Sequence, residues 1–284
     1  MAHVSVIVPT FNRLRYLKPA IESVCAQTYT DWDMTIADDG SDAETRAYLS
    51  SIVGPRTRVL WLDHTGNPSY VRNVAIGSAT GRYLAFLDSD DVWDPMKLEC
   101  QIEALKTSPA SGWCYCLERM IDAAGAPWTR SRIRTFSPQD GWVFGALLRL
   151  ELALSMPTIV ARRDLIERIG RFDESLRFCE WHDLCLRLAL QSEVIGARQI
   201  LCSVRSHDEH YSADRTGELR GWVQLYSKMA RIAPSDELRS YCRRQAARAC
   251  LRVASFRGRE KGCLTRVAGL LRALPDAWRV MRSA

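Results

Sequence analysis

The chain of 284 residues has 47% hydrophobic and 25% charged residues, which is ordinary for a globular protein, and its length suits one large domain or two small ones. No apolar run approaches the roughly 18 residues that would span a bilayer, which argues against a membrane-spanning helix. The net charge is +6, but the part from Glu218 to the end alone carries 15 Lys and Arg against 5 Asp and Glu, so the remainder is slightly acidic.

The beginning of the chain, MAHVSVIVPTFNR, has an apolar segment only as long as a β-strand and no charged residues leading into it. This is not the pattern of a secretory signal peptide, so we expect a cytoplasmic protein. The ten cysteines should then be free, mostly buried thiols. They show no C-x-x-C spacing, and we expect no zinc site.

Strands and helices are predicted to alternate four times in the first part of the chain. The strand segments are apolar and rich in β-branched residues, as in buried parallel strands, and the helical segments carry apolar residues at helical spacing. The last of these helices starts at a proline, as helices often do. In chain order we predict strand 3–12, helix 14–29, strand 33–41, helix 42–52, strand 58–64, helix 68–79, strand 82–91 and helix 95–107.

This alternation predicts an open, mostly parallel α/β sheet flanked by helices. Crossovers in such sheets are right-handed, so the C-terminal ends of the strands share one edge, and ligands bind beyond that edge. Five polar side chains follow the strands directly and are expected there: Asn12, Asp38, Asp39, Asp88 and Asp90.

The stretch YLAFLDSDDVWDP, residues 83–95, ends an apolar strand at three carboxylates, Asp88, Asp90 and Asp91. Like charges this close repel each other unless a cation or several hydrogen-bond donors compensate them. A solvated turn is the alternative, because Asp and Ser are common turn residues. The chain has neither G-x-G-x-x-G nor G-x-x-x-x-G-K-[ST]. A phosphate would therefore have to be held in another way, and a divalent cation bound by carboxylates can do so.

The pattern is less regular after residue 110. We predict strand 112–122, an exposed loop over 125–142, a short strand and a helix within 154–176, a helix over 180–190, and a strand over 200–207 that ends at His207. Helices follow over 221–233 and after Pro234.

Six motifs in this order resemble family 2 glycosyltransferases, which have the GT-A fold. Together they extend over about three-quarters of the chain, and their order is far more specific than any one of them. The motifs are VSVIVPTFNR (4–13), ADDGS (37–41), VRNVAIGSATGRYLAFLDSDD (71–91), FDESL (172–176), E-x-x-D-L-x-L-R-L (180–188) and H-x-x-x-x-S (207–212).

The resemblance implies a GT-A domain over residues 1–215, with a nucleotide-sugar-binding half (1–110) and an acceptor half (111–215). A basic helical C-terminal extension would follow over 216–284. It also implies an inverting enzyme that moves a sugar from a nucleotide-diphosphate sugar to an acceptor hydroxyl, with Mn²⁺ or Mg²⁺ as cofactor. The expected acceptor is a saccharide or a lipid-linked molecule in bacterial surface polysaccharide or glycolipid assembly, and no nucleic acid is expected as a partner.

Carried over residue by residue, the resemblance places nucleotide-sugar binding on one group of side chains. Phe11 would stack on the base, and Asp39 would accept a base N–H; for Phe11 the alternative is a core residue at the strand end. Arg72 would contact the nucleotide or its diphosphate, with an ion pair to Asp38 or Asp39 as the alternative, and Asn73 would support the loop. The nucleotide-sugar-binding residues we predict are Pro9, Thr10, Phe11, Asn12, Asp38, Asp39, Arg72, Asp88 and Ser89.

The resemblance assigns the metal to Asp90 directly, with Asp88 assisting through the ribose or a bound water. Asp91 would face the acceptor or support the metal ligands. His207 resembles the histidine that completes the metal–diphosphate site. A neutral imidazole can bind Mn²⁺, and an imidazolium can hydrogen-bond the diphosphate.

The general base is where this sequence departs from the family. The family usually has Glu-Asp at the head of the E-D-x-D-L-x-L-R helix, and that Asp deprotonates the acceptor, but here the position is Trp181. Glu180 and Asp183 flank it, and because they are three residues apart they can share one side of a helix. Either is a candidate base. The alternative is a non-catalytic nucleotide-sugar-binding module. A nucleotidyltransferase is a weaker option, because it normally needs the glycine-rich phosphate loop that is missing.

The basic extension suggests an anionic partner. Its last part, CLTRVAGLLRALPDAWRVMRS, places arginines between apolar residues at helical spacing. Segments of this kind lie in the interface of anionic membranes, which predicts a peripheral protein at the inner face of the cytoplasmic membrane. A helix whose apolar face packs on the protein is the alternative.

Overall fold

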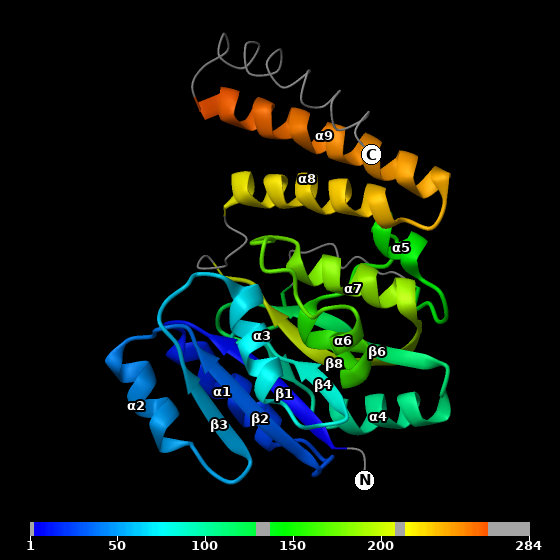
Figure 1. Cartoon of the computed structure of the whole chain (residues 1–284). Helices are drawn as coiled ribbons and strands as arrows, with labels where there is room; N and C mark the ends of the chain where they lie inside the picture. Colours follow the sequence, from blue (N-terminus) through cyan, green and yellow to red (C-terminus); the bar gives the residue numbers. More distant parts are fainter. Residues whose placement is uncertain (1–2, 129–136, 208–213, 261–284) are drawn as a thin grey trace. The chain divides into compact units, whose positions relative to one another are not determined.

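The computed structural model describes residues 3–128, 137–207 and 214–260 (Figure 1). The described residues form two compact units: 3–128 and 137–173 with 184–207, and 174–183 with 214–260. The boundary predicted at residue 215 is not tested by this division and stays a prediction. No helix in the described parts combines the length and the apolar character that crossing a bilayer requires.

The first unit contains the predicted alternation of strands and helices. Its strands are β1 (Val4–Thr10), β2 (Trp32–Asp38), β3 (Thr57–Trp61), β4 (Tyr83–Phe86), β5 (Val92–Trp93), β6 (Ser111–Ile121), β7 (Ile159–Arg162) and β8 (Glu193–Arg205). Its helices are α1 (Leu14–Cys25), α2 (Ala43–Ser51), α3 (Pro68–Ser78), α4 (Lys97–Thr107), α5 (Phe144–Leu148), the 3₁₀ helix η1 (Met156–Thr158), α6 (Arg163–Arg168) and most of α7 (Glu180–Gln191).

One eight-stranded sheet runs through this unit in the order β3-β2-β1-β4-β7-β6-β8-β5. The pairs β1–β2, β2–β3, β1–β4 and β6–β8 are parallel, which confirms a mostly parallel sheet. The sequence did not indicate that β7 would insert antiparallel between β4 and β6. Nor did it indicate that Val92 and Trp93, which directly follow the acidic turn, would form the short strand β5, antiparallel to β8.

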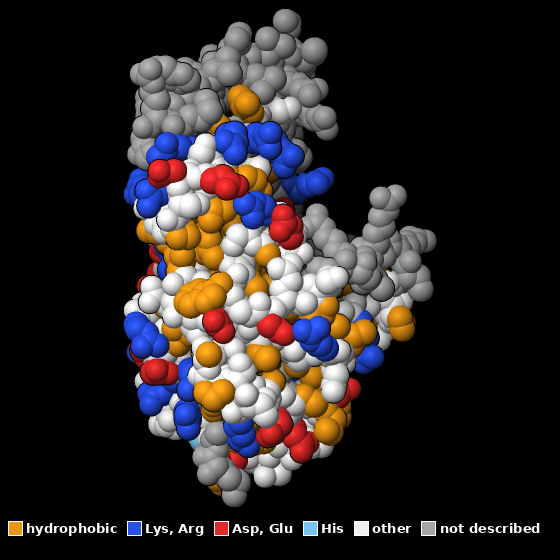
Figure 2. Space-filling model, turned by 90° about the vertical axis from the view of Figure 1, so that its right-hand side faces the viewer, with side chains coloured by type: hydrophobic (Ala, Val, Ile, Leu, Met, Phe, Trp, Pro, Cys, Tyr) orange, Lys and Arg blue, Asp and Glu red, His pale blue; other side chains and the backbone are white. Residues whose placement is uncertain are grey.

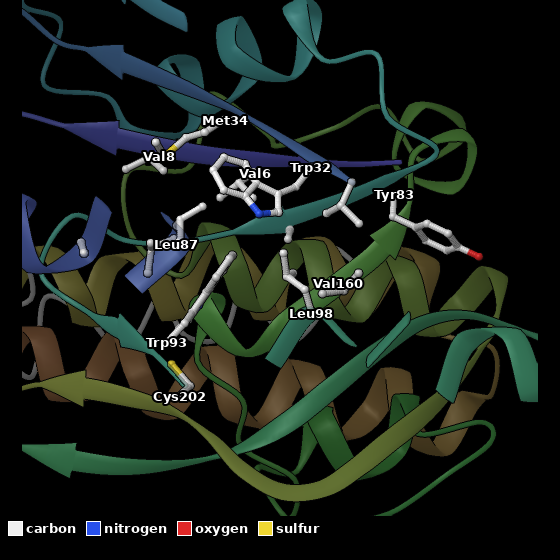
Figure 3. Close-up of a cluster of buried hydrophobic side chains, with 14 of the residues drawn as sticks. Val6, Val8, Trp32, Met34, Tyr83, Leu87, Trp93, Leu98, Val160 and Cys202 are labelled. Atoms are coloured by element: carbon white, nitrogen blue, oxygen red, sulfur yellow. The ribbon is translucent and has the colours of Figure 1, made fainter. Parts of the chain in front are cut away.

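The core of the first unit lies between the sheet and helices α1, α2 and α4. Alternate β1 residues Val4, Val6 and Val8 point into it, because successive side chains of a strand face opposite sides. Figure 3 shows Val6, Val8, Trp32 and Met34 of the neighbouring strands in this cluster, with Trp93 and Leu98. Helix α3 contributes nothing to the cluster and packs on β1 and β2.

Short polar side chains set the helix starts next to the predicted ligand edge. Asp42 caps α2 by accepting a hydrogen bond from the backbone N–H of Thr45, and this bond lowers the pKa of its carboxyl. Asn67 caps α3 in the same way, directly before a proline at the first helical position. The chain therefore turns sharply after β2 and β3, and the residues after each strand stay close to the sheet.

The helices of the second unit follow a short irregular segment, residues 174–179. The unit contains the first turn of α7, then α8 (Arg215–Ile232) and α9 (Asp236–Glu260), which lie side by side as a hairpin (Figure 1). The predicted helix 221–233 therefore begins six residues earlier, where the Asp214 side chain caps the backbone N–H groups of Thr216 and Gly217.

Candidate functional site

The acidic turn of residues 88–91 connects β4 to β5. The predicted strand 82–91 ends earlier, at Phe86, and a turn closes with the backbone N–H of Asp91 donating to the carbonyl of Asp88 at 3.1 Å. Ser89, Asp90 and Asp91 are 6%, 4% and 3% exposed. A solvated turn is therefore ruled out, and these buried charges require compensation.

Each of the three carboxylates has a different form of compensation. Asp88 accepts from Arg72 at 2.6 Å. Asp90 forms an ion pair with Arg13 and lies 3.0 Å from Nε2 of His207, both through Oδ2. Asp91 accepts from the backbone N–H of Arg205 at 2.8 Å. Burial, together with the charges of Asp90 and Asp88, raises the pKa of Asp91 well above its usual range.

Arg205 fastens the acidic turn to the rest of the unit. Its Nε donates to the carbonyl of Asp90 at 2.8 Å, and its Nη1 donates to the carbonyls of Asp122 and Ala123. The ring of Tyr16 stacks on His207 with centroids 4.7 Å apart, and the Arg205 guanidinium lies 5.1 Å from the same ring. The sequence analysis missed the roles of Arg13, Tyr16 and Arg205. The only signal for any of them was the position of Arg13 at the end of VSVIVPTFNR.

His207 reaches Asp90 across 117 residues of sequence because of the pairing between β5 and β8. Val92 pairs with Ser203 in antiparallel register. Residues before Val92 therefore lie opposite residues after Ser203, which brings the acidic turn to the end of β8.

Asp90 and His207 can supply two ligands to a divalent cation, which is only part of its coordination shell. A carboxylate oxygen and an imidazole nitrogen are donors that suit Mn²⁺. Among the residues that the structure describes, no three His, Cys, Asp or Glu side chains gather into a fuller set. Cations held by one or two carboxylates commonly complete their coordination with phosphate oxygens of the substrate and with water.

Asp39 organises the loop of residues 64–66 next to β1. One carboxylate oxygen accepts from the backbone N–H and the hydroxyl of Thr65, and the other accepts from the backbone N–H of Gly66, all at 2.9 Å. This fixes the loop that carries His64, whose ring stacks on Phe11 with centroids 4.0 Å apart. Phe11 is 38% exposed, which shows that it is not a core residue, and His64 was not predicted.

The other predicted binding residues have mainly structural contacts in this unit. Asp38 is fully buried and accepts from Arg46 and from the backbone N–H of Ser41. Asn12 has a positive φ of 50° and accepts from the backbone N–H of Asp42. Pro9 and Thr10 end β1, beside Phe11.

Arg72 and Asn73 face different partners, although they are adjacent on α3. Arg72 pairs with Asp88, a partner that the sequence analysis did not name for it. Asn73 donates to the carbonyl of Phe172 at 2.9 Å and accepts from its backbone N–H at 3.0 Å. It thereby holds the start of the FDESL segment, which agrees with the supporting role expected for it.

The two candidate bases belong to the first turn of α7, in the second unit. Asp183 is 0% exposed and forms a 2.7 Å ion pair with Lys228 of α8. Glu180 is 7% exposed. Between them, the His182 ring packs against Trp181 and Trp222, and burial lowers the pKa of His182 to about 3, so this side chain is neutral at neutral pH.

Comparison with known proteins gives a consistent set of similarities. Residues 5–168 match the sequence profile of Glycosyl transferase family 2. Over 236 residues the chain is 26% identical to an uncharacterized glycosyltransferase of Rickettsia prowazekii (strain Madrid E), covering 83% of this chain and 74% of the relative. A shorter match of 102 residues at 37% identity covers 36% of this chain and 40% of the UDP-Glc:alpha-D-GlcNAc-diphosphoundecaprenol beta-1,3-glucosyltransferase WfgD of Escherichia coli.

Solved structures share the fold. S. aureus TarS 1-349 in complex with UDP-GlcNAc superposes with a TM-score of 0.72 at 19% identity, covering 98% of this chain and 81% of that one. The mannosyltransferase PcManGT from Pyrobaculum calidifontis, in complex with GDP-Man and Mn²⁺, gives 0.66 at 18% identity, covering 99% and 81%. At these identities the similarity establishes the GT-A fold and nothing finer.

Proposed function

The chain belongs to glycosyl transferase family 2, and from this premise we propose that it transfers a sugar from a nucleotide-diphosphate sugar to an acceptor hydroxyl with inversion at the anomeric carbon. The observation that carries the proposal is the pairing of Asp90 with His207 beside Arg72 and Asp88, at the edge of the sheet where β1, β2 and β4 end. Cationic and carboxylate groups meet there in an arrangement that suits a diphosphate and a divalent cation.

The nucleotide would lie along the ends of β1 and β2. Phe11 offers a partly exposed aromatic ring for the base, and the loop organised by Asp39 lies beside it. Pro9, Thr10, Asn12 and Asp38 shape the chain around this loop, and Ser89 precedes Asp90 in the acidic turn. Arg72 would exchange its contact with Asp88 for the diphosphate, which a guanidinium binds through two parallel hydrogen bonds.

Asp90 and His207 would hold the cation, with Asp88 assisting. A divalent cation bound there supplies charge neutralisation for the diphosphate leaving group. The chain's own contribution is to bury these groups and to keep Asp90 close to His207 through the anchoring of the turn by Arg205. Asp91 would support the turn by accepting the hydrogen bond from the backbone N–H of Arg205.

Glu180 is our choice for the general base. It would accept the proton of the acceptor hydroxyl at its carboxylate as that oxygen attacks the face of the sugar opposite the diphosphate. Asp183 is less suited, because its buried ion pair with Lys228 would have to break first.

We take the acceptor to be a saccharide, free or lipid-linked, used in surface polysaccharide or glycolipid assembly. The glucosyltransferase WfgD, which matches about a third of this chain, is named for a diphosphoundecaprenol-linked acceptor.

The deciding experiment is a donor screen that follows release of nucleoside diphosphate with Mn²⁺ or Mg²⁺, in the presence of an extract that contains acceptors. We expect one donor to be consumed, more slowly after a chelator is added, and its sugar to appear in the acceptor fraction with inverted configuration. If a donor binds and no sugar is transferred in any extract, the chain is the non-catalytic binding module. If pyrophosphate is released, it is a nucleotidyltransferase.

We also propose that the C-terminal part contacts an anionic membrane surface. On the visible face in Figure 2, Lys and Arg side chains gather at the height where Figure 1 shows α8 and α9. Arg244, Arg248 and Arg252 of α9 are exposed at intervals of four residues, so they share one side of the helix. The segment for which membrane binding was predicted, 262–284, lies outside the described residues.

Vesicle co-sedimentation tests this contact. We expect the protein to sediment with anionic vesicles at low salt, to be released from them at high salt, and not to sediment with neutral vesicles. The reason is that each Lys or Arg near an anionic surface contributes about 1 kcal/mol to the free energy of binding. Truncation before residue 262 should weaken binding, and replacing Arg244, Arg248 and Arg252 by Gln should weaken it further. A full-length protein that stays in the supernatant with anionic vesicles at low salt contradicts the proposal.

A further inference from the structure

Asp90, the central carboxylate of the acidic turn, already has a cationic partner from the protein itself. Nη1 of Arg13 and Nε2 of His207 both contact the same oxygen, Oδ2. The side chains of Asp90 and His207 are 6% and 2% exposed, and that of Arg13 is 21% exposed. The oxygen at which a metal would bind is thus covered by a guanidinium.

The backbone of Arg13 is fixed, but its side chain is long enough to move. Its carbonyl accepts the first hydrogen bonds of α1, from the backbone N–H groups of Tyr16 and Leu17. Directly before it, the Asn12 side chain and backbone bond Asp42 and Ser41. The Cα of Arg13 therefore cannot shift, whereas its partly exposed guanidinium can rotate away about several side-chain bonds.

A guanidinium and a divalent cation cannot share Oδ2 of Asp90 at close range, because like charges repel strongly in a site that excludes water. A buried carboxylate that loses the cation at its oxygen is strongly destabilised, so one of the two cations must be present. The diphosphate of a donor changes this balance. It brings phosphate oxygens to complete the coordination of the metal, and negative charge for the released guanidinium.

We propose that Arg13 is the resident counter-ion of Asp90, and that it competes with the divalent cation so that the cation binds well only together with the nucleoside diphosphate. The inference rests on the proposed function for the identity of the cation and the donor. It adds a positioning role for Arg13: the residue keeps Asp90 in place in the donor-free enzyme and makes metal and donor binding cooperative.

The test is titration of the donor-free full-length protein with Mn²⁺ alone, followed by calorimetry or by the Mn²⁺ electron paramagnetic resonance signal. Arg13→Met should bind Mn²⁺ at least about tenfold more tightly than the unchanged protein. Arg13→Lys keeps the positive charge, so its affinity should stay close to that of the unchanged protein. If Arg13→Met folds poorly, Arg13→Gln serves the same purpose.

Two controls separate competition at Asp90 from general effects. Arg46→Met removes the guanidinium partner of another buried carboxylate, Asp38, at 3.0 Å, and should leave Mn²⁺ affinity unchanged. The double variant Arg13→Met/Asp90→Asn should lose the added Mn²⁺ affinity.

A second arm measures cooperativity. The ligand added is the nucleoside diphosphate that the donor screen identifies. It should increase the Mn²⁺ affinity of the unchanged protein by a larger factor than it increases the Mn²⁺ affinity of Arg13→Met. Equal Mn²⁺ affinities of Arg13→Met and the unchanged protein, while turnover stays sensitive to chelator, would overturn the inference and leave the proposed function standing. Turnover that does not change when a chelator is added would refute the assignment of a catalytic metal to Asp90 and His207.

Discussion

Asp90→Asn should abolish sugar transfer, with kcat/KM lower by about 10³-fold or more. The change keeps the shape of the side chain and removes the charge that would bind the cation, whose stabilisation of the leaving diphosphate is worth several kcal/mol; each 1.36 kcal/mol corresponds to a tenfold change in rate. The measurement is steady-state release of nucleoside diphosphate from the donor that the screen identifies, with Mn²⁺ held at saturation.

The interpretation of Asp90→Asn needs a control for folding, because this residue also pairs with Arg13 and lies beside His207. Thermal unfolding of each variant provides it. Asp88→Asn should lower activity by a smaller factor, since Asp88 is expected to assist and not to bind the metal directly. Activity of Asp90→Asn within a few-fold of the unchanged enzyme, or activity that survives a chelator, would show that the acidic turn does not hold a catalytic cation.

Glu180→Gln should lower kcat by about 10²-fold or more, which is the usual contribution of a general base. Binding of the nucleoside diphosphate, measured by calorimetry, should stay unchanged, because the base acts on the acceptor. Loss of kcat with intact nucleotide binding distinguishes a missing base from a damaged donor site.

Asp183→Asn is the matched control for Glu180→Gln. It removes the charge partner of Lys228 from a fully buried position, so we expect a loss of about 3 kcal/mol in the free energy of unfolding and a smaller effect on kcat than that of Glu180→Gln.

Trp181→Asp in the Glu180→Gln background restores a carboxylate where the family carries its base, and should recover activity if α7 presents that position to the acceptor. A fully active Glu180→Gln beside an inactive, well-folded Asp183→Asn would reverse the two roles.

The sequence alone was sufficient for the family and for most of the first unit. Apolar periodicity depends on which face of a strand or helix is buried. This is a local property, and it can be recognised from the order of apolar and polar residues within each segment. The alternation of strands and helices up to α4 and the position of the acidic turn beyond β4 both follow from such local patterns. The boundaries were less certain, and β4 ends five residues before the predicted strand end because the acidic residues form a turn.

The tertiary structure decided which charges meet. The resemblance grouped Asp90 with His207 at a metal site, but nothing in the sequence near Asp90 indicates Arg13 as a partner. These contacts depend on the antiparallel register of β5 and β8 and on the placement of α1 beside them. The pairing of Asp183 with Lys228, which separates the two candidate bases, likewise connects α7 and α8 across 45 residues of chain. Ion pairs of this kind depend on long-range packing and carry no periodic signal. The sequence could therefore name the carboxylates of the site, but only the folded chain shows that one of them is already neutralised by an arginine.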